Sequence, residues 1–361
     1  SGSTPKTNID EYWEGTIKWI TPAELNDDTY IITDSVRKIT ELAVKKTGLK
    51  SFPEGTVILS SRAPIGKVAI AGCEMYCNQG FKNLICSKKI NNKYLYWFLK
   101  GNTVFLNSLG RGATFKELSK SIVSNIEINL PDIVYQKKAV ETLEKVSEII
   151  ALRKRELSSL DDLIKARFVE MFGDPATNPM RWSETTIGDE CFYIKDGPHK
   201  SLPDIGKENG GHPFISVRNI VNGYIDFSTA RYISDEDYAN AIKKCHPEKG
   251  DMLYSKGGTT GIAKLIDIDE EFANWVHVAV LKFDKSKLNG IFFENMLNGD
   301  YCFEQSQRLT KGIANRDLVL SAMAQIKMYR PPMEIQKQFA DFVNQVDKSK
   351  LYKISTLQFP C

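Results

Sequence analysis

Four short segments of the sequence combine glycine with basic, hydroxyl and amide side chains, a mixture suited to hydrogen bonding with nucleic acid. They read SSRAPIGK (60–67), SKGGTTG (255–261), GRGATFK (110–116) and TKGIANR (310–316). Arg and Lys bind guanine edges or phosphates, Asn and Gln pair with adenine, and Ser and Thr bond to either base. The candidate side chains are Ser61, Arg62, Lys67, Arg111, Thr114, Lys116, Lys256, Thr259, Thr260, Lys311, Asn315 and Arg316.

The alternative interpretation is that these segments are ordinary turns, polar only because loops face solvent. Two of them, however, keep basic residues at matching positions. Arg111 corresponds to Lys311 and Lys116 to Arg316, while the neutral residues between them differ. Matching cations with variable neighbours suit shared phosphate contacts around different base contacts. We therefore predict nucleic-acid contacts at these loops and keep the turn interpretation as the alternative for any single residue.

The loops belong to an internal repeat. Residues 57–70 correspond to 252–265 with a constant offset of 195 residues, and residues 109–146 correspond to 309–346 with an offset of 200. The difference of five residues is the size of a surface-loop insertion. Residues 182–197 have no counterpart in the first repeat, which therefore lacks an opening strand. Identical pairs in the second block are Leu109/Leu309, Gly112/Gly312, Leu118/Leu318, Ile126/Ile326, Pro131/Pro331, Gln136/Gln336, Lys137/Lys337 and Val146/Val346.

Each repeat ends in a pattern typical of a long helix. Prolines at 131 and at 331–332 mark the change from strand to helix, because proline cannot continue a strand ladder. We predict helices over 136–172 and 334–356, the first of them ended by Gly173. Apolar residues at heptad spacing predict a seam along which the first helix packs on another helix. The seam residues are Leu143, Val146, Ile150, Leu157, Leu160 and Ile164.

The composition is that of an ordinary globular protein. Of the 361 residues, 42% are hydrophobic and 26% are charged, and no apolar run approaches the ~18–20 residues that span a bilayer. A net charge of +3 permits a nucleic-acid partner if the basic residues gather on one face. The seven cysteines have no paired spacing, which favours free thiols in a reducing cytoplasm over a metal site.

The motifs of DNA-modifying catalysis are missing from the sequence. An adenine methyltransferase needs an Asp/Asn-Pro-Pro-aromatic motif, and the nearest strings, NPMR (178–181) and RPPM (330–333), do not match it. No Gly-rich loop follows a strand to hold a cofactor, and no phosphate-binding loop is present. The segment PDIGKE (203–208) has only a superficial likeness to a nuclease site. We therefore predict no catalytic residue, no cofactor and no metal in this chain.

Three segments, together with the twice-used proline–glutamine junction into a long helix, resemble one known family. They are SGSTPKTNIDEYWEGTIKWITPAEL (1–25), LDDLIKARFVEMFGDPATNP (160–179) and IKDGPHKS (194–201). In combination they resemble the specificity subunit of type I restriction–modification systems, and the resemblance covers nearly the whole chain.

The resemblance implies an α+β fold of two similar mixed α/β target-recognition domains, separated by two long antiparallel helices in a pseudo-twofold internal repeat. It assigns 1–135 to the first domain, 136–172 to the central helix, 173–180 to a linker, 181–333 to the second domain and 334–356 to a short distal helix. The helices are expected to act as spacer and as docking surface for partner subunits.

The resemblance also implies a function. Each domain would read one half of a bipartite sequence in double-stranded DNA. The chain itself would be non-catalytic and would direct two methyltransferase subunits and the restriction subunits that act as motor and nuclease. S-adenosylmethionine, ATP and magnesium would be bound by those partners. The complex would work in the cytoplasm, with no membrane involved.

Two other classes of function remain open at this point. A tandem scaffold that binds protein would explain the repeat equally well, and only DNA binding that weakens steeply with salt separates it from a DNA reader. A free-standing DNA methyltransferase is the second alternative, although the missing motifs argue against it. Binding of a methyl donor to the isolated chain would decide that question.

Overall fold

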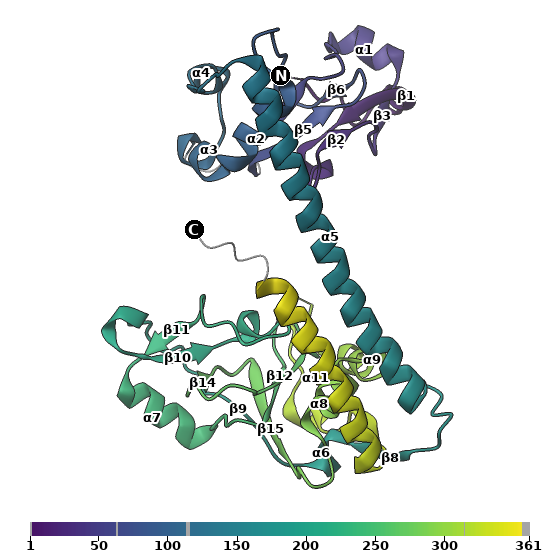
Figure 1. The fold of residues 1–361 in the computed structure, drawn as a ribbon, viewed down its shortest axis with the longest axis vertical. Coiled ribbons are helices and arrows are strands. Elements are labelled where there is room, and N and C mark those ends of the chain that lie inside the picture. Colours follow the sequence, from purple (N-terminus) through teal and green to yellow (C-terminus); the bar gives the residue numbers. More distant parts are fainter. Residues whose placement is uncertain (1, 63, 113–115, 314, 356–361) are drawn as a thin grey trace. The chain divides into compact units, whose positions relative to one another are not determined.

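The computed structural model describes residues 2–62, 64–112, 116–313 and 315–355 of the chain. It divides the chain into two compact units, Ser1–Leu152 (unit 1) and Arg153–Cys361 (unit 2). Each unit has its own sheets, its own helices and its own hydrophobic clusters (Figure 1). None of the described helices is both long enough and apolar enough to cross a membrane.

Unit 1 is built on a four-stranded sheet of order β2-β5-β4-β7 and a three-stranded sheet of order β3-β1-β6. Alternate residues of β4 fill two different hydrophobic clusters, because successive side chains of a strand point to opposite faces: Val57 and Leu59 pack with helix α2, and Ile58 packs with Phe81. The strands are β1 (Trp13–Ile20), β2 (Ile31–Ile32), β3 (Lys38–Ile39), β4 (Val57–Ser61), β5 (Ile65–Ala71), β6 (Tyr76–Cys77) and β7 (Phe81–Leu84). The helices before the long one are α1 (Glu41–Thr47), α2 (Asn92–Gly101), α3 (Thr103–Leu109) and α4 (Lys120–Ser124).

Unit 2 is built on a four-stranded sheet of order β13-β12-β15-β9, a three-stranded sheet of order β11-β10-β14 and the pair β16-β8. Its strands are β8 (Ser183–Thr186), β9 (Cys191–Asp196), β10 (His212–Ile215), β11 (Arg231–Ile233), β12 (Met252–Ser255), β13 (Ala263–Leu265), β14 (Ala273–Asn274), β15 (Val278–Phe283) and β16 (Lys327–Arg330). Its shorter helices are α6 (Ile187–Glu190), α7 (Asp235–Lys244), α8 (Gly290–Asn298), α9 (Asp300–Leu309) and α10 (Leu320–Met323).

The two units repeat one pairing pattern, and the α+β fold predicted from the sequence is confirmed. Hairpin β4–β5 corresponds to β12–β13, and β7 and β15 pair antiparallel with the first strand of each hairpin. The parallel pairs β1–β6 and β10–β14 also correspond. Unit 2 has in addition β9 beside β15 and β8 beside β16. Within the described part of unit 1, no strand corresponds to β8, β9 or β16.

Two long helices follow the sheets. Helix α5 (Ile133–Phe172) begins three residues before the predicted start at 136, because the Asp132 carboxylate accepts hydrogen bonds from the backbone N–H groups of Val134 and Tyr135 and caps the helix there. It ends as predicted at Phe172, where Gly173 adopts a left-handed backbone with φ of 76°. Helix α11 (Met333–Ser355) follows β16.

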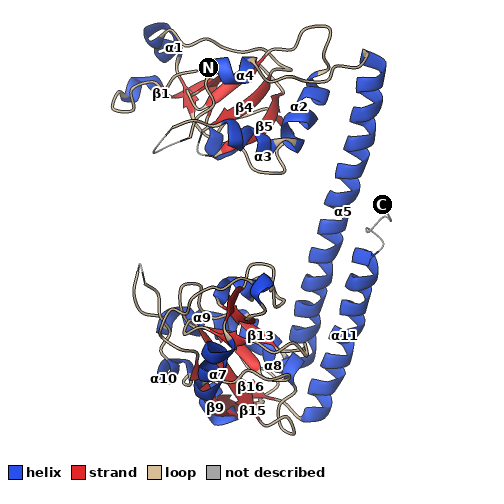
Figure 2. Cartoon of the chain, turned by 90° about the vertical axis from the view of Figure 1, so that its left-hand side faces the viewer, coloured by secondary structure: helices blue, strands red, loops and turns tan. Residues whose placement is uncertain are grey.

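The predicted heptad seam is covered only in its second half, where Ile164 is buried and Leu157 and Leu160 are half-buried. In unit 2, α11 lies antiparallel along α5 (Figure 2), and Lys350 of α11 pairs with Asp161 of α5 at 2.7 Å. Ile164 is buried in this contact, and Leu160 packs against the same cluster. The seam residues within unit 1 keep much of their surface exposed instead: 40% for Leu143, 47% for Val146 and 46% for Ile150.

Four phenylalanines join the long helices of unit 2 to its shorter helix α8. Phe168 and Phe172 of α5, Phe339 of α11 and Phe292 of α8 have ring centroids 4.8–5.8 Å apart. Such aromatic contacts add to the stability supplied by burial itself. The domain boundaries predicted at 181 and 333 therefore fall between side chains that share one hydrophobic core. Unit 2 begins further back, at Arg153 within α5.

The proline–glutamine junction has the same geometry at the start of both long helices. The side chains of Gln136 and Gln336 are fully buried. Each side-chain carbonyl accepts a 2.8 Å hydrogen bond from the backbone N–H of the asparagine, Asn91 or Asn289, that caps α2 or α8. Each side-chain amide donates to two backbone carbonyls, those of Lys89 and Pro131 in unit 1 and of Lys287 and Pro331 in unit 2. One buried glutamine thus fixes the start of each long helix to the start of α2 or α8.

Candidate nucleic-acid interface

Two of the predicted loops are closed by the same backbone bridge. Arg111 and Glu117 exchange N–H to O bonds of 3.1 and 2.9 Å, and Lys311 and Asp317 exchange two bonds of 2.9 Å. The next residue of each loop bonds to the neighbouring hairpin, with Leu118 N donating to Ser61 O and Leu318 N to Lys256 O. The structure therefore brings the predicted loops together in pairs, one pair in each unit.

An ion pair between a largely buried lysine and a half-exposed carboxylate holds each loop, and the lysine comes from a different place in each unit. In unit 2, Lys256, directly after β12, is 5% exposed, and its ammonium lies 2.9 Å from Asp317 and 3.6 Å from Asp196. In unit 1 the ammonium of Lys82, on β7, lies 3.1 Å from Glu117. Lys256 is therefore committed to contacts inside the protein, because a buried ammonium needs the carboxylates that pair with it.

Two further predicted residues also lie inside the fold. The Ser61 hydroxyl is 0% exposed and donates to the Gly80 carbonyl at 3.1 Å. Thr260 is 2% exposed and its hydroxyl lies 2.9 Å from that of Thr310. We therefore remove Ser61, Thr260 and Lys256 from the proposed DNA face. Their burial depends on neighbouring strands and helices that a local pattern does not reveal.

The other predicted residues keep accessible side chains where the structure describes them. Arg111, Lys116, Lys311, Asn315 and Thr259 are exposed. Arg316, Arg62 and Lys67 are half-buried, and the Lys67 ammonium donates to the Pro22 carbonyl at 3.2 Å. Thr114 lies outside the described residues.

Beside the 311–317 loop, unit 2 contains a cavity of about 610 Å³. Four separate segments line it: the turn after β10, the glycines after β12, the residues after β14 and the loop itself. An adjoining cavity of about 190 Å³ shares Ser216, Arg218 and Trp275 and adds Arg231. The lining residues of the larger cavity are Ser216, Val217, Arg218, Gly257, Gly258, Trp275, His277, Asn315, Arg316 and Asp317.

The cavities are rich in hydrogen-bond donors. Among the described residues, Arg218, Arg231 and Arg316 form no ion pair with a carboxylate, and Arg231 lies 5.9 Å from the Trp275 ring centre. The indole N–H of Trp275 and Nδ1 of His277 are buried without a hydrogen-bond partner in the described structure. A buried polar group without a partner costs about 1–3 kcal/mol, so the Trp275–His277 wall stores a cost that a better packed apolar wall would not carry. Sequence reasoning missed Arg218, Trp275 and His277, because no local pattern joins them.

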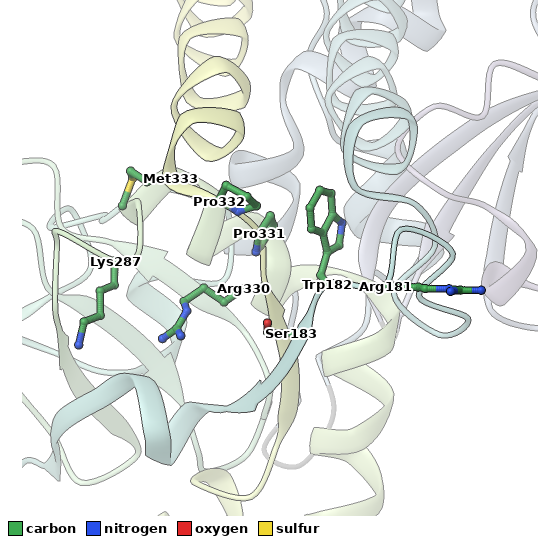
Figure 3. Close-up of a pocket in the computed structure, with 8 residues that line it drawn as sticks. All are labelled: Arg181, Trp182, Ser183, Lys287, Arg330, Pro331, Pro332 and Met333. Atoms are coloured by element: carbon green, nitrogen blue, oxygen red, sulfur yellow. The ribbon is translucent and has the colours of Figure 1, made fainter.

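A second cavity, of about 470 Å³, lies where β16 meets α11 (Figure 3). Three basic side chains line it, but their charged groups do not point toward one another. Arg330 is paired with the buried Glu190 at 2.9 Å and Lys287 with Asp284 at 3.5 Å, while Arg181 points away from both. The arrangement ties β16 and α6 together beside the start of α11 and forms no focused anion site.

The cysteines described by the structure are free thiols. Burial raises the pKa of both Cys191 and Cys302 to about 12, so these two side chains are neutral near pH 7 and pack as apolar groups. Within the described ranges, no group of three or more His, Cys, Asp or Glu side chains is placed to hold a metal ion.

A sequence model of the type I restriction modification DNA specificity domain matches residues 1–161 and again residues 179–357. The chain belongs to this family. Two specificity-family relatives come from Methanocaldococcus jannaschii. The type I restriction enzyme MjaIX specificity subunit is 33% identical over 306 residues, which cover 80% of this chain and 70% of the relative. The MjaVIII specificity subunit is 23% identical over 364 residues, which cover 96% of this chain and 83% of the relative.

Solved structures share the fold of this specificity-family chain. The crystal structure of a type I restriction–modification S subunit from M. genitalium aligns with a TM-score of 0.50 at 15% identity, over 97% of this chain and 90% of that one. A chain from a study of complex assembly and conformational transition in the type I system aligns with a TM-score of 0.54 at 17% identity, over 98% and 90%.

Proposed function

We propose that each unit of this DNA-sequence-specificity subunit reads one half of a bipartite double-stranded DNA target. The observation that supports it is the pair of matching loops. Residues 111–117 and 311–317 are closed by the same kind of backbone bridge, and each is bonded to the hairpin of its own unit, yet the sequences between their basic residues differ. One scaffold carrying two different sets of donors suits one chain that reads two different half-sites.

We assign catalysis to the partner subunits of the complex. Two methyltransferase subunits would bind S-adenosylmethionine and flip the target base, and restriction subunits would use ATP and magnesium. This chain would supply sequence recognition and docking surface in the cytoplasm. Selection of randomised duplexes by the complex of this chain with its methyltransferase subunits tests the proposal. Two conserved half-sites separated by an unread gap are expected, and a single continuous site or no preferred sequence would contradict it.

The isolated chain is expected to transfer no methyl group to DNA. This follows from the absence of a methyltransferase motif in its sequence. Purified chain is incubated with duplex DNA and radiolabelled methyl donor, with and without the methyltransferase subunits. Label incorporated by the chain alone would restore the free-standing methyltransferase alternative.

The matching cations of the loops are expected to contact phosphates. Arg111→Ala or Lys311→Ala should weaken binding to all sequences evenly and reduce the slope of log affinity against log salt by about 0.9. Asn315→Ala, if the amide contacts a base, should relax one position of the target at a cost of about 1–3 kcal/mol. Fluorescence anisotropy across a salt series measures both effects. Unchanged affinity and specificity in all three variants would place the DNA face elsewhere.

A further inference from the structure

The cavity beside the 311–317 loop of unit 2 is lined by residues that differ from their counterparts in unit 1. Matched backbone bonds allow their residues to be compared one by one. Trp275 N donates to Ile215 O as Asn78 N donates to Ile20 O. Trp275 therefore occupies the place of Asn78.

Two further backbone bonds extend the comparison to the residues beside Trp275. Lys256 N donates to His277 O as Ser61 N donates to Gly80 O, so His277 occupies the place of Gly80. Ser216 N donates to the side-chain oxygen of Asn219 at 2.8 Å, as Thr21 N donates to the carboxylate of Glu24 at 2.8 Å. Arg218 lies two residues after Ser216 in unit 2, and Ala23 lies two residues after Thr21 in unit 1. Ala23 is therefore the counterpart of Arg218.

The substitutions at these positions build the cavity. Gly257 leaves room for the His277 ring, since a methyl group at Gly257 would overlap it. In unit 1 the large and the small side chain change places. Arg62 is the counterpart of Gly257, and Gly80 is the counterpart of His277. Beside His277, the Trp275 indole carries the second buried nitrogen without a partner. Arg218 is exposed at the rim, and one of its nitrogens donates to the Thr229 carbonyl at 2.6 Å. This bond fixes the guanidinium while leaving other N–H groups free.

The differences between the units separate base contacts from phosphate contacts. Arg316 has a basic counterpart, Lys116, and so suits a phosphate that both half-sites present. Arg218, Trp275 and His277 have the neutral counterparts Ala23, Asn78 and Gly80, and so suit a feature found in one half-site only.

Among bases, guanine presents two acceptors, N7 and O6, on its major-groove edge, and a bidentate arginine is the commonest specific contact to it. Resting on the proposed DNA-reading function, we propose that Arg218, at the rim of the Trp275–His277 cavity, reads a guanine in the half-site recognised by unit 2. Trp275 and His277 act as positioning residues that shape the cavity wall beside it.

The test uses the complex of the full chain with its methyltransferase subunits and a pool of randomised duplexes. Arg218→Ala should lose its preference for guanine at one position of the unit 2 half-site by roughly 10- to 100-fold and keep every other preference. Arg218→Lys keeps the charge but loses the bidentate geometry, so it should show most of the same loss. Arg308→Ala, which removes an exposed arginine paired with Glu304, should behave as the parent chain.

A second arm replaces that guanine by 7-deazaguanine, which lacks the N7 acceptor. The parent complex should bind the altered duplex more weakly, while the Arg218→Ala complex should not distinguish the two duplexes. If Arg218→Ala weakens binding to all sequences equally, or if the affected position is not guanine, the inference is wrong while the proposed function still stands. A parent complex that selects no bipartite sequence would overturn the proposed function itself.

Discussion

Exchange of unit 2 for that of another family member is expected to change one half of the DNA target completely and to leave the other half unchanged. The two units have separate sheets and separate cores, so the loops of unit 1 lose no supporting contact within unit 1. The exchange should comprise residues 153–355. Joining the chains between Leu152 and Arg153 preserves the phase of helix α5, and the phenylalanine contacts of unit 2 stay together. Methylome sequencing of cells that carry the chimera and its methyltransferase subunits reports the target.

A chimera from the same donor joined at 181 and 333 is the matched control. It should give the same half-site but a less stable protein, because Phe292 comes from one parent while Phe168 and Phe339 come from the other. If both half-sites change in the methylome of the first chimera, the two units do not recognise their half-sites independently.

Substitution of the junction glutamine Gln336 by Ala is expected to lower the free energy of unfolding of unit 2 by about 3–4 kcal/mol. The side chain is fully buried and bonds to Asn289 N, Lys287 O and Pro331 O. Its removal leaves these backbone groups buried without partners, each at a cost of about 1–3 kcal/mol before relaxation. Gln336→Met keeps most of the volume and should lose nearly as much, which separates hydrogen bonding from cavity formation.

Gln338→Ala provides the control, because it makes the same substitution at an exposed position of the same helix and should change stability by less than about 0.5 kcal/mol. Urea denaturation gives the free energies, and hydrogen exchange of peptides from α8 and α11 localises the change. Gln136→Ala should produce the corresponding loss in unit 1, where the same three bonds are made. Equal stability of Gln336→Ala and Gln338→Ala would show that the junction does not depend on these bonds.

The repeated architecture could be predicted without the structure. Offsets of 195 and 200 residues identified two copies of one plan, and the matching strand pairs of the two units agree with them. Proline punctuation and apolar periodicity predicted both long helices to within a few residues of α5 and α11. These signals are readable because helix periodicity and turn chemistry depend on neighbours along the chain. The recurrence of glutamine five residues after a proline was visible too, although its three bonds were not.

Which side chains are available to a ligand could not be predicted, because it depends on contacts between distant segments. Lys256 and Lys311 are both lysines in glycine-containing loops, yet one is 5% exposed and paired with Asp317 while the other faces solvent. The cavity of unit 2 likewise joins Arg218, Trp275 and Arg316 from three distant segments. Parallel pairing of β10 with β14 brings the first two together, and the bond from Leu318 N to Lys256 O adds the loop. Such contacts depend on long-range strand pairing and on burial, which no local periodicity encodes.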